Sequence, residues 1–243
     1  MLKIVKFSKD FLLVAQITRI IQPFLKWLHF LFYFNKLAAW VHKNKSQLLY
    51  SDFYSPIRNY PKRYQLYGFV ADHLRLREKQ IIYLEFGVAS ASSFKWWLNT
   101  NNHKDSFFAG FDTFEGLPEQ WGSFFEKGAM SFQLPDISDS RAHFRKGLFQ
   151  DTLTGFLKEQ SDLLYNNEYV RVIHLDADLY SSTAFTLSQL YPYLQKGDVI
   201  MFDEFNVALH EFKAYDEFVS NFYIRLKPVA AVNNFYQTAF VVE

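Results

Sequence analysis

The chain has 243 residues, of which 49% are hydrophobic, so it is long enough and apolar enough to form one or two globular domains. Its 26 Lys and Arg nearly balance its 25 Asp and Glu. This balance argues against a nucleic-acid-binding protein, which needs a strongly basic surface. No cysteine is present, so disulfides and thiolate metal sites are excluded and any metal must have oxygen or imidazole ligands.

Residues 1–50 form a basic arm. They contain eight Lys and Arg but a single acid, a net charge of +7, whereas the rest of the chain has 18 basic and 24 acidic residues, a net charge of −6. Helical spacing predicts one or two amphipathic helices with a break near Pro23. The apolar residues that show this spacing are Phe24, Leu28, Leu31 and Phe34/Leu37. The longest uncharged stretch, Trp27–Asn35, is too short to cross a bilayer.

Two interpretations of the arm stay open. Its helices pack on the body of the protein or on a second subunit, in which case we expect a homo-oligomer, or residues 1–45 contact a membrane surface. The apolar stretch is too long for a cleavable signal peptide and contains Pro23. We therefore expect a cytoplasmic protein, peripheral at the membrane if the arm binds lipid.

After residue 80, short β-rich runs alternate with helical stretches, which predicts a three-layer, Rossmann-like α/β fold: a mostly parallel sheet with a C-terminal antiparallel hairpin. Residues 51–80 are interpreted as a connecting segment and 81–243 as the main domain. The expected strands are Ile81–Val88, Phe107–Thr113, His143–Phe149, Tyr169–Asp176, Asp198–Asp203, Leu226–Val232 and Tyr236–Val242. The expected helices are Ser92–Thr100, Asp151–Leu164, Ser181–Leu194 and His210–Phe222.

The first two strands end in acidic residues. Glu85 is followed by Gly87 and a turn that opens a helix, and the second strand ends at Asp112. Neither a P-loop nor the three-glycine dinucleotide motif is present. A carboxylate at this place favours a cationic, nucleoside-bearing ligand such as S-adenosylmethionine. The alternative is that Glu85 only caps the helix and Gly87 only turns the chain.

Four more carboxylates follow later strands: Asp176, Asp178, Asp203 and Glu204. If these strands are neighbours, the carboxylates meet at one edge of the sheet with no Lys or Arg interleaved in the sequence. Such a cluster implies a bound cation or shifted pKa values. Oxygen ligands favour Mg²⁺, with Ca²⁺ or Mn²⁺ as alternatives. In the alternative interpretation, each aspartate caps the helix that follows it.

Together these motifs resemble the macrocin O-methyltransferases (TylF/MycF type), Mg²⁺-dependent class I enzymes that use S-adenosylmethionine. The resemblance spans about residues 60–243. The blocks that carry it are Glu85-Phe86-Gly87-Val88, Gly110 to Glu119, His174 to Thr183, and Phe202-Asp203-Glu204-Phe205 with Ala214 to Phe218 following.

The resemblance implies a role for individual residues. Glu85 and Gly87 would border the cofactor, and Asp112 would hold its ribose. The implied Mg²⁺ ligands are Asp176, Asp203 and Glu204. Asp178 matches the family's proposed general base, with His210 as the second candidate. Further cofactor-binding candidates are Ser90 and Ser92 in the turn after the first strand, and Gln150 and Asp151 after the third.

The sequence departs from the family pattern at two positions. Ala91 stands where a glycine is common, which requires a negative φ at this residue. Glu204 replaces the second aspartate of an Asp-Asp pair. In addition, Leu179 stands where catechol-type enzymes carry a lysine, so the base must be another residue.

The leading hypothesis is an O-methyltransferase (EC 2.1.1.-) that methylates a hydroxyl on a sugar of a secondary metabolite or glycan. The Phe-rich loop 113–140 would cover the active site or form ordinary core. A different class is a non-catalytic, methyltransferase-like scaffold or membrane-associated partner protein. A third hypothesis is a metal-dependent hydrolase, against which Glu85 and Asp112 argue.

Overall fold

The computed structural model describes residues 2–16, 18–121 and 125–243. Its centre is an eight-stranded sheet within these residues, in the order β1-β7-β8-β6-β5-β2-β3-β4. Neighbouring strands are parallel except at β8, which runs antiparallel to β6 and β7. The strands are β1 (Tyr50–Ser51), β2 (Ile81–Phe86), β3 (Phe107–Asp112), β4 (Ala142–Lys146), β5 (Val170–Leu175), β6 (Val199–Phe202), β7 (Leu226–Val232) and β8 (Gln237–Val242).

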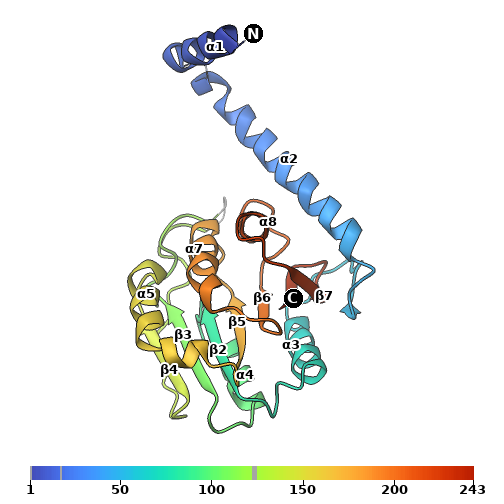
Figure 1. The fold of residues 1–243 in the computed structure, drawn as a ribbon, viewed down its shortest axis with the longest axis vertical. Helices are drawn as coiled ribbons and strands as arrows, with labels where there is room; N and C mark the ends of the chain where they lie inside the picture. Colours follow the sequence, from blue (N-terminus) through green and yellow to red (C-terminus); the bar gives the residue numbers. More distant parts are fainter. Residues whose placement is uncertain (1, 17, 122–124) are drawn as a thin grey trace.

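Helices cover both faces of the sheet, so the body has three layers (Figure 1). Alternate residues of β2 point to opposite faces: Ile82 and Leu84 join one hydrophobic cluster, Ile81 and Tyr83 the other. Helices α5, α7 and α8 pack in the first cluster, α3 and α4 in the second. The expected three-layer, mostly parallel fold with a C-terminal antiparallel hairpin is confirmed. These helices are α3 (Lys62–His73), α4 (Ser92–Thr100), α5 (Phe149–Glu159), α7 (Tyr180–Leu190) and α8 (Glu211–Asn221).

The predicted elements of the body occur, with differences at their ends. The helix expected at Asp151–Leu164 is two helices, α5 and α6 (Ser161–Tyr165). The helix expected to end at Leu194 ends as α7 at Leu190, followed by a 3₁₀ turn that contains Pro192. Proline has no N–H to donate to the preceding turn, so the α-helix stops there.

The segment expected to connect the arm to the body belongs to the sheet structure. Helix α3 lies within it and buries Leu66, Tyr67 and Val70 in the second cluster. β1 overlaps its first residue and pairs with β7. The body therefore begins near residue 50.

The arm consists of α1 (Leu2–Ala15) and α2 (Thr18–Asn44). The expected break at Pro23 is wrong, because Pro23 lies inside α2. It is near the start of the helix and removes a single backbone hydrogen bond there. Gln16 instead adopts a left-handed conformation with φ 50° at the end of α1. None of the described helices is long and apolar enough to span a membrane.

The C-terminal half of α2 packs on the body, whereas its N-terminal half and α1 project away (Figure 1). Trp40 lies among the rings of Phe205, Tyr215 and Phe240, and its indole N–H donates to the Tyr215 hydroxyl at 3.1 Å. The Tyr33 hydroxyl donates to Glu217 at 2.9 Å. This half of α2 is therefore part of the core.

Candidate active site

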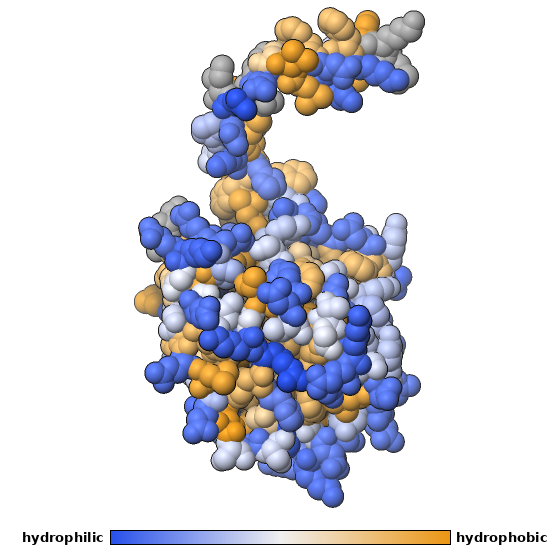
Figure 2. Space-filling model, turned by 90° about the vertical axis from the view of Figure 1, so that its left-hand side faces the viewer, coloured by the Kyte–Doolittle hydropathy of each residue, from blue (hydrophilic) through white to orange (hydrophobic). Residues whose placement is uncertain are grey.

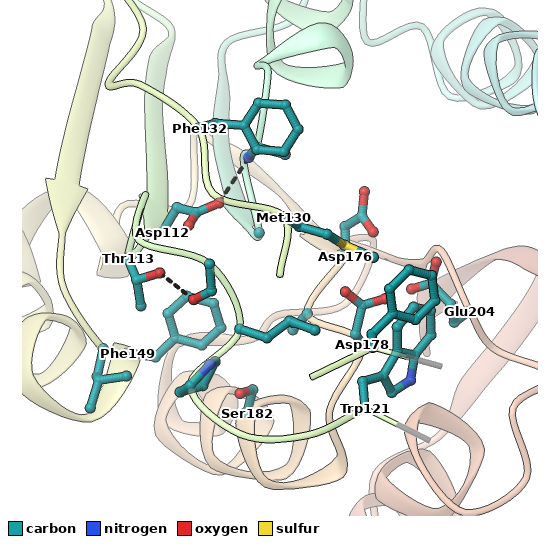
Figure 3. A pocket seen from close by; sticks show the side chains of 18 of the residues that line it. Asp112, Thr113, Trp121, Met130, Phe132, Phe149, Asp176, Asp178, Ser182 and Glu204 are labelled. Carbon is teal, nitrogen blue, oxygen red and sulfur yellow. Dashed lines mark hydrogen bonds between the residues drawn. The ribbon is translucent and has the colours of Figure 1, made fainter. Parts of the chain in front are cut away.

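A cavity of about 400 Å³ lies at the carboxyl ends of β2, β3 and β5, where ligands bind in open parallel sheets. Figure 3 shows Asp112 and Thr113 on one side of it and Asp176, Asp178 and Glu204 on the other. The structure thus brings strand-end acids from distant parts of the sequence to one cavity.

The turn after β2 approaches the end of β5 closely. Gly87 has φ +94°, and a Cβ at this position would lie 1.8 Å from the carbonyl oxygen of Asp176. Only glycine fits there without moving the backbone. Asp112 fixes the turn from β3: its Oδ2 accepts the N–H groups of Val88 and Ala89, each at 2.8 Å, and its Oδ1 accepts that of Phe114 at 2.8 Å. Asp112 therefore shapes the cavity wall through backbone amides.

Ala91 differs from the expectation. The sequence requires a negative φ at this residue, but the structure gives φ 60° at the start of α4. A left-handed conformation costs an alanine about 1–2 kcal/mol relative to the ordinary helical one. The methyl group is buried in the second hydrophobic cluster, and burial of this kind offsets part of that cost.

Three carboxylates meet at the other side of the cavity. Oxygens of Asp176, Asp178 and Glu204 lie within 4.8 Å of one another. Burial raises the pKa of Asp178 to about 7, and the charge of Asp203 adds to this effect. Burial and the charge of Asp176 hold the pKa of Glu204 well above its usual range. Glu204 Oε2 is buried and has no hydrogen-bond partner, so this oxygen lacks the donor that a buried carboxylate needs.

Asp203, expected to be a metal ligand with Asp176 and Glu204, forms a second such group with Asp176 and His174, whose ligand atoms also lie within 4.8 Å of one another. It is 1% exposed and does not line the cavity. Arg63 from α3 pairs with it at 2.8 Å and lies 3.8 Å from Asp176. Asp203 also accepts a hydrogen bond from the Tyr67 hydroxyl at 3.4 Å. The sequence suggested carboxylates without a basic neighbour, and the structure corrects this, because α3 brings Arg63 to them.

Glu85, expected at the cofactor, is buried and does not line the cavity. The Tyr83 hydroxyl donates to it at 2.7 Å. Burial raises the pKa of Glu85 to about 8. The Tyr83 hydroxyl also lies 2.8 Å from Nδ1 of His174, whose Nε2 lies 3.3 Å from the Tyr67 hydroxyl. Glu85 and Asp203 are thus the two ends of a buried polar network.

The other predicted site residues divide between the cavity and the surface. Gln150 lines the cavity, whereas Asp151 is exposed at the start of α5. The hydroxyls of Ser90 and Ser92 lie 2.9 Å apart on the surface, outside the cavity. His210 does not line the cavity either.

His210 instead supports the start of a neighbouring helix. Its Nδ1 accepts the Tyr180 N–H at 3.3 Å, at the first residue of α7. Partial burial lowers the pKa of His210 below its usual value.

The loop after β3 forms much of the cavity wall. Leu117, Trp121, Phe125, Met130 and Phe132 all line it. The rings of Trp121 and Phe125 stack with centroids 5.0 Å apart. These side chains face the cavity, as the cover interpretation expected, whereas Phe114 of the same loop is buried in the second hydrophobic cluster.

Sequence reasoning missed Tyr60, Tyr236 and Arg63. The two tyrosines line the cavity, and their ring centroids lie 6.0 Å apart. They come from the segment before α3 and from the turn between β7 and β8. No local pattern marks these residues, because each belongs to the site only through the tertiary fold.

Part of the chain matches a known protein family. Residues 124–237 match the macrocin O-methyltransferase (TylF) family. The resemblance seen in the motifs is thereby confirmed for the part of the chain that contains Asp176 to Glu204, while Glu85 and Asp112 precede the matched residues. No curated protein sequence matches the chain.

Solved methyltransferases share the fold. The calicheamicin methyltransferase CalS11 is 19% identical, with a TM-score of 0.55 over 86% of this chain and 91% of that one. The O-methyltransferase NovP is 18% identical, with a TM-score of 0.52 over 75% and 78% of the two chains. The chain therefore has the fold of these methyltransferases.

Proposed function

We propose that the protein is a metal-dependent O-methyltransferase that transfers the methyl group of S-adenosylmethionine to a hydroxyl of a sugar. The observation that carries this proposal is one cavity lined by the Gly87 turn and Asp112 and, opposite Asp112, by three clustered carboxylates. The TylF match supports the reaction class. The description of CalS11 as a TDP-rhamnose 3'-O-methyltransferase supports a sugar acceptor.

The cavity suits S-adenosylmethionine in size and charge. Its volume of about 400 Å³ lies in the range of small-molecule sites. Gly87 and Ala89 line the cavity, so a ligand can lie directly against the backbone of this turn. Oδ1 of Asp112 accepts a single backbone hydrogen bond, so it has capacity left for a ribose hydroxyl. Leu148, Phe149 and Gln150 would flank the adenine.

A divalent cation fits the carboxylates that face the cavity. Asp176, Asp178 and Glu204 offer three oxygens within 4.8 Å, and the unpartnered Oε2 of Glu204 needs a positive neighbour. Oxygen ligands of this kind suit Mg²⁺. We therefore keep Asp176 and Glu204 as ligands and place Asp178, rather than Asp203, as the third. Asp203 does not line the cavity, and Arg63 lies closer to it, at 2.8 Å, than to Asp176, at 3.8 Å.

S-adenosylmethionine would supply the methyl group, and the bound cation would lower the pKa of the acceptor hydroxyl. Asp178 remains the candidate general base, because it lines the cavity and a carboxylate has a second oxygen free to accept the hydroxyl proton. Tyr60 and Tyr236 stand beside the carboxylates and would position the sugar ring.

The first test is calorimetry with S-adenosylmethionine, followed by methyl transfer to a panel of glycosides with Mg²⁺ or with excess EDTA. We expect binding, and turnover only with the metal. Absence of cofactor binding would indicate the non-catalytic scaffold, and undiminished turnover in EDTA would remove the metal from the mechanism.

Two variants test the roles of the aspartates. Asp178→Asn keeps an oxygen ligand but loses the proton acceptor, so kcat should fall by about 10² to 10⁴ while cofactor affinity stays within a few-fold. Asp203→Asn should leave Mg²⁺ affinity nearly unchanged, because Asp203 does not face the cavity. Severe loss of Mg²⁺ binding in Asp203→Asn would restore the ligand set implied by the family resemblance.

A further inference from the structure

The projecting part of the arm has an unusual amount of exposed apolar surface. Of the 29 large hydrophobic side chains that are exposed among the described residues, 16 lie between Ile4 and Phe34. Their exposed fractions run from 37% to 83%. Figure 2 shows hydrophobic side chains gathered on the arm, at the end of the molecule remote from the body. Soluble monomers rarely leave so large an apolar patch without a partner.

Helix α1 is amphipathic. Ile4, Phe7 and Phe11 recur at intervals of three and four residues, so they lie on one face of the helix. Lys6 and Lys9 lie away from the centre of that face. This combination of aromatic and aliphatic residues with lysines beside them is typical of helices that lie in the plane of a membrane interface.

Helix α2 also carries its apolar and its basic residues on different sides. Phe24, Leu28 and Leu31 repeat at intervals of four and three residues and remain exposed. Helical geometry places Arg19 and Lys26 on the same side of α2 as Tyr33, which contacts the body. The apolar stripe therefore lies on the side of α2 that the body does not cover.

The charge of the arm favours one occupant for this surface. Lys6, Lys9, Arg19 and Lys26 form no ion pair among the described residues, whereas Lys36 on the docked half pairs with Asp216 at 2.6 Å. Two such arms packed together would add like charges, with only Asp10 on each arm to offset them. An anionic lipid surface offers both the apolar environment and the negative charge.

We propose that residues 2–32 dock on the surface of an anionic phospholipid bilayer, with the apolar faces of α1 and the N-terminal half of α2 in the interface and the basic side chains at the headgroups. The arm lies on the bilayer and does not cross it. Figure 1 shows the arm projecting from the end of the body to which the carboxyl ends of β3 and β5 point. The docked arm holds the cavity near the lipid surface.

The test is co-sedimentation of the full chain with phosphatidylcholine vesicles, with and without phosphatidylserine. We expect at least tenfold stronger partition to the anionic vesicles, and a decrease of that partition as salt is raised. The variant Phe7→Glu/Phe11→Glu should lose at least tenfold in partition. Tyr223→Glu is the matched control, because Tyr223 is a 91% exposed aromatic residue on the body, and it should bind as wild type does.

Light scattering without vesicles separates lipid binding from self-association. Phe7 and Phe11 are exposed, so their substitution should change neither the melting temperature nor the mass in solution. The proposal fails if the wild type does not sediment with anionic vesicles. It also fails if the double variant reduces an oligomer to a smaller species, since the apolar face would then bind a second copy of the chain.

Discussion

Arg63 forms an ion pair with the buried Asp203 at 2.8 Å. Removing one member of a buried ion pair leaves the other charge without compensation, at a cost of about 3–5 kcal/mol. Arg63→Ala should therefore lower the melting temperature by about 10 °C. Arg77→Ala removes an exposed pair with Asp72 and should change the melting temperature little. Equal shifts in thermal unfolding for the two variants would contradict this role for Arg63.

Glu85 makes stability depend on pH. Burial raises its pKa from 4.5 to about 8, so the folded state keeps a proton that the unfolded state releases above pH 4.5. The loss of folding stability caused by Glu85 is absent below pH 4.5, grows as the pH rises, and is complete above pH 8. Glu85→Gln cannot ionise, so its melting temperature relative to wild type should rise by about 5 °C or more between pH 5 and pH 8.5.

The measurement is thermal unfolding of the protein without ligands across this pH range. Glu78→Gln, at an exposed site, controls for the loss of one acidic side chain. A difference between Glu85→Gln and wild type that stays constant with pH would show that Glu85 does not hold the proton.

Local sequence predicted part of the site and could not predict the rest. Asp112 and Asp176 follow strands, and the ends of parallel strands meet at one edge of the sheet, so their convergence was predictable. Arg63 is more than 100 residues from Asp176 and reaches it only because α3 packs on the second face of the sheet. The contact of Arg63 with Asp203 depends on that packing as well.

At the scale of elements, the close approach of the β2 turn to the end of β5 depends on Gly87. Gly87 and Gly197 have nearly the same φ, +94° and +96°, but a Cβ at Gly197 meets no atom within 4 Å. Gly197→Ala should therefore show only the conformational cost of about 1–2 kcal/mol. Gly87→Ala must also displace the backbone at Asp176.

We expect Gly87→Ala to lose S-adenosylmethionine binding in calorimetry and to melt well below Gly197→Ala. The difference between the two variants isolates the steric contact from the backbone conformation. Similar melting temperatures together with intact cofactor binding in Gly87→Ala would contradict the close approach.

The elements that sequence predicted best are those with a continuous local pattern. The helix at Ser92–Thr100 was predicted with its observed bounds, and the buried strands read as apolar runs typical of a parallel sheet. Helix α3 was missed, because its sequence contains Gly68 and several aromatic residues with weak helix propensity. Packing against the sheet, rather than local preference, stabilises it.

At the scale of the whole molecule, α2 has two parts with different roles. Tyr33 and Leu37 are buried in the first hydrophobic cluster, and Trp40 packs against it. The residues before them project from the body and contribute little to its core. The stability of the body should therefore depend on where the arm is cut.

Deletion of residues 1–31 should leave the melting temperature within a few degrees of the full chain, because it removes only projecting residues. Deletion of residues 1–44 also removes Tyr33, Leu37 and Trp40, whose burial is worth about 1.5–3 kcal/mol each. This shorter protein should melt at least about 10 °C lower and expose the aromatic surface around Tyr215, which favours self-association. Thermal unfolding and light scattering of both deletions check this expectation. If the first deletion destabilises the body as strongly as the second, the projecting half of the arm contributes to the fold as well.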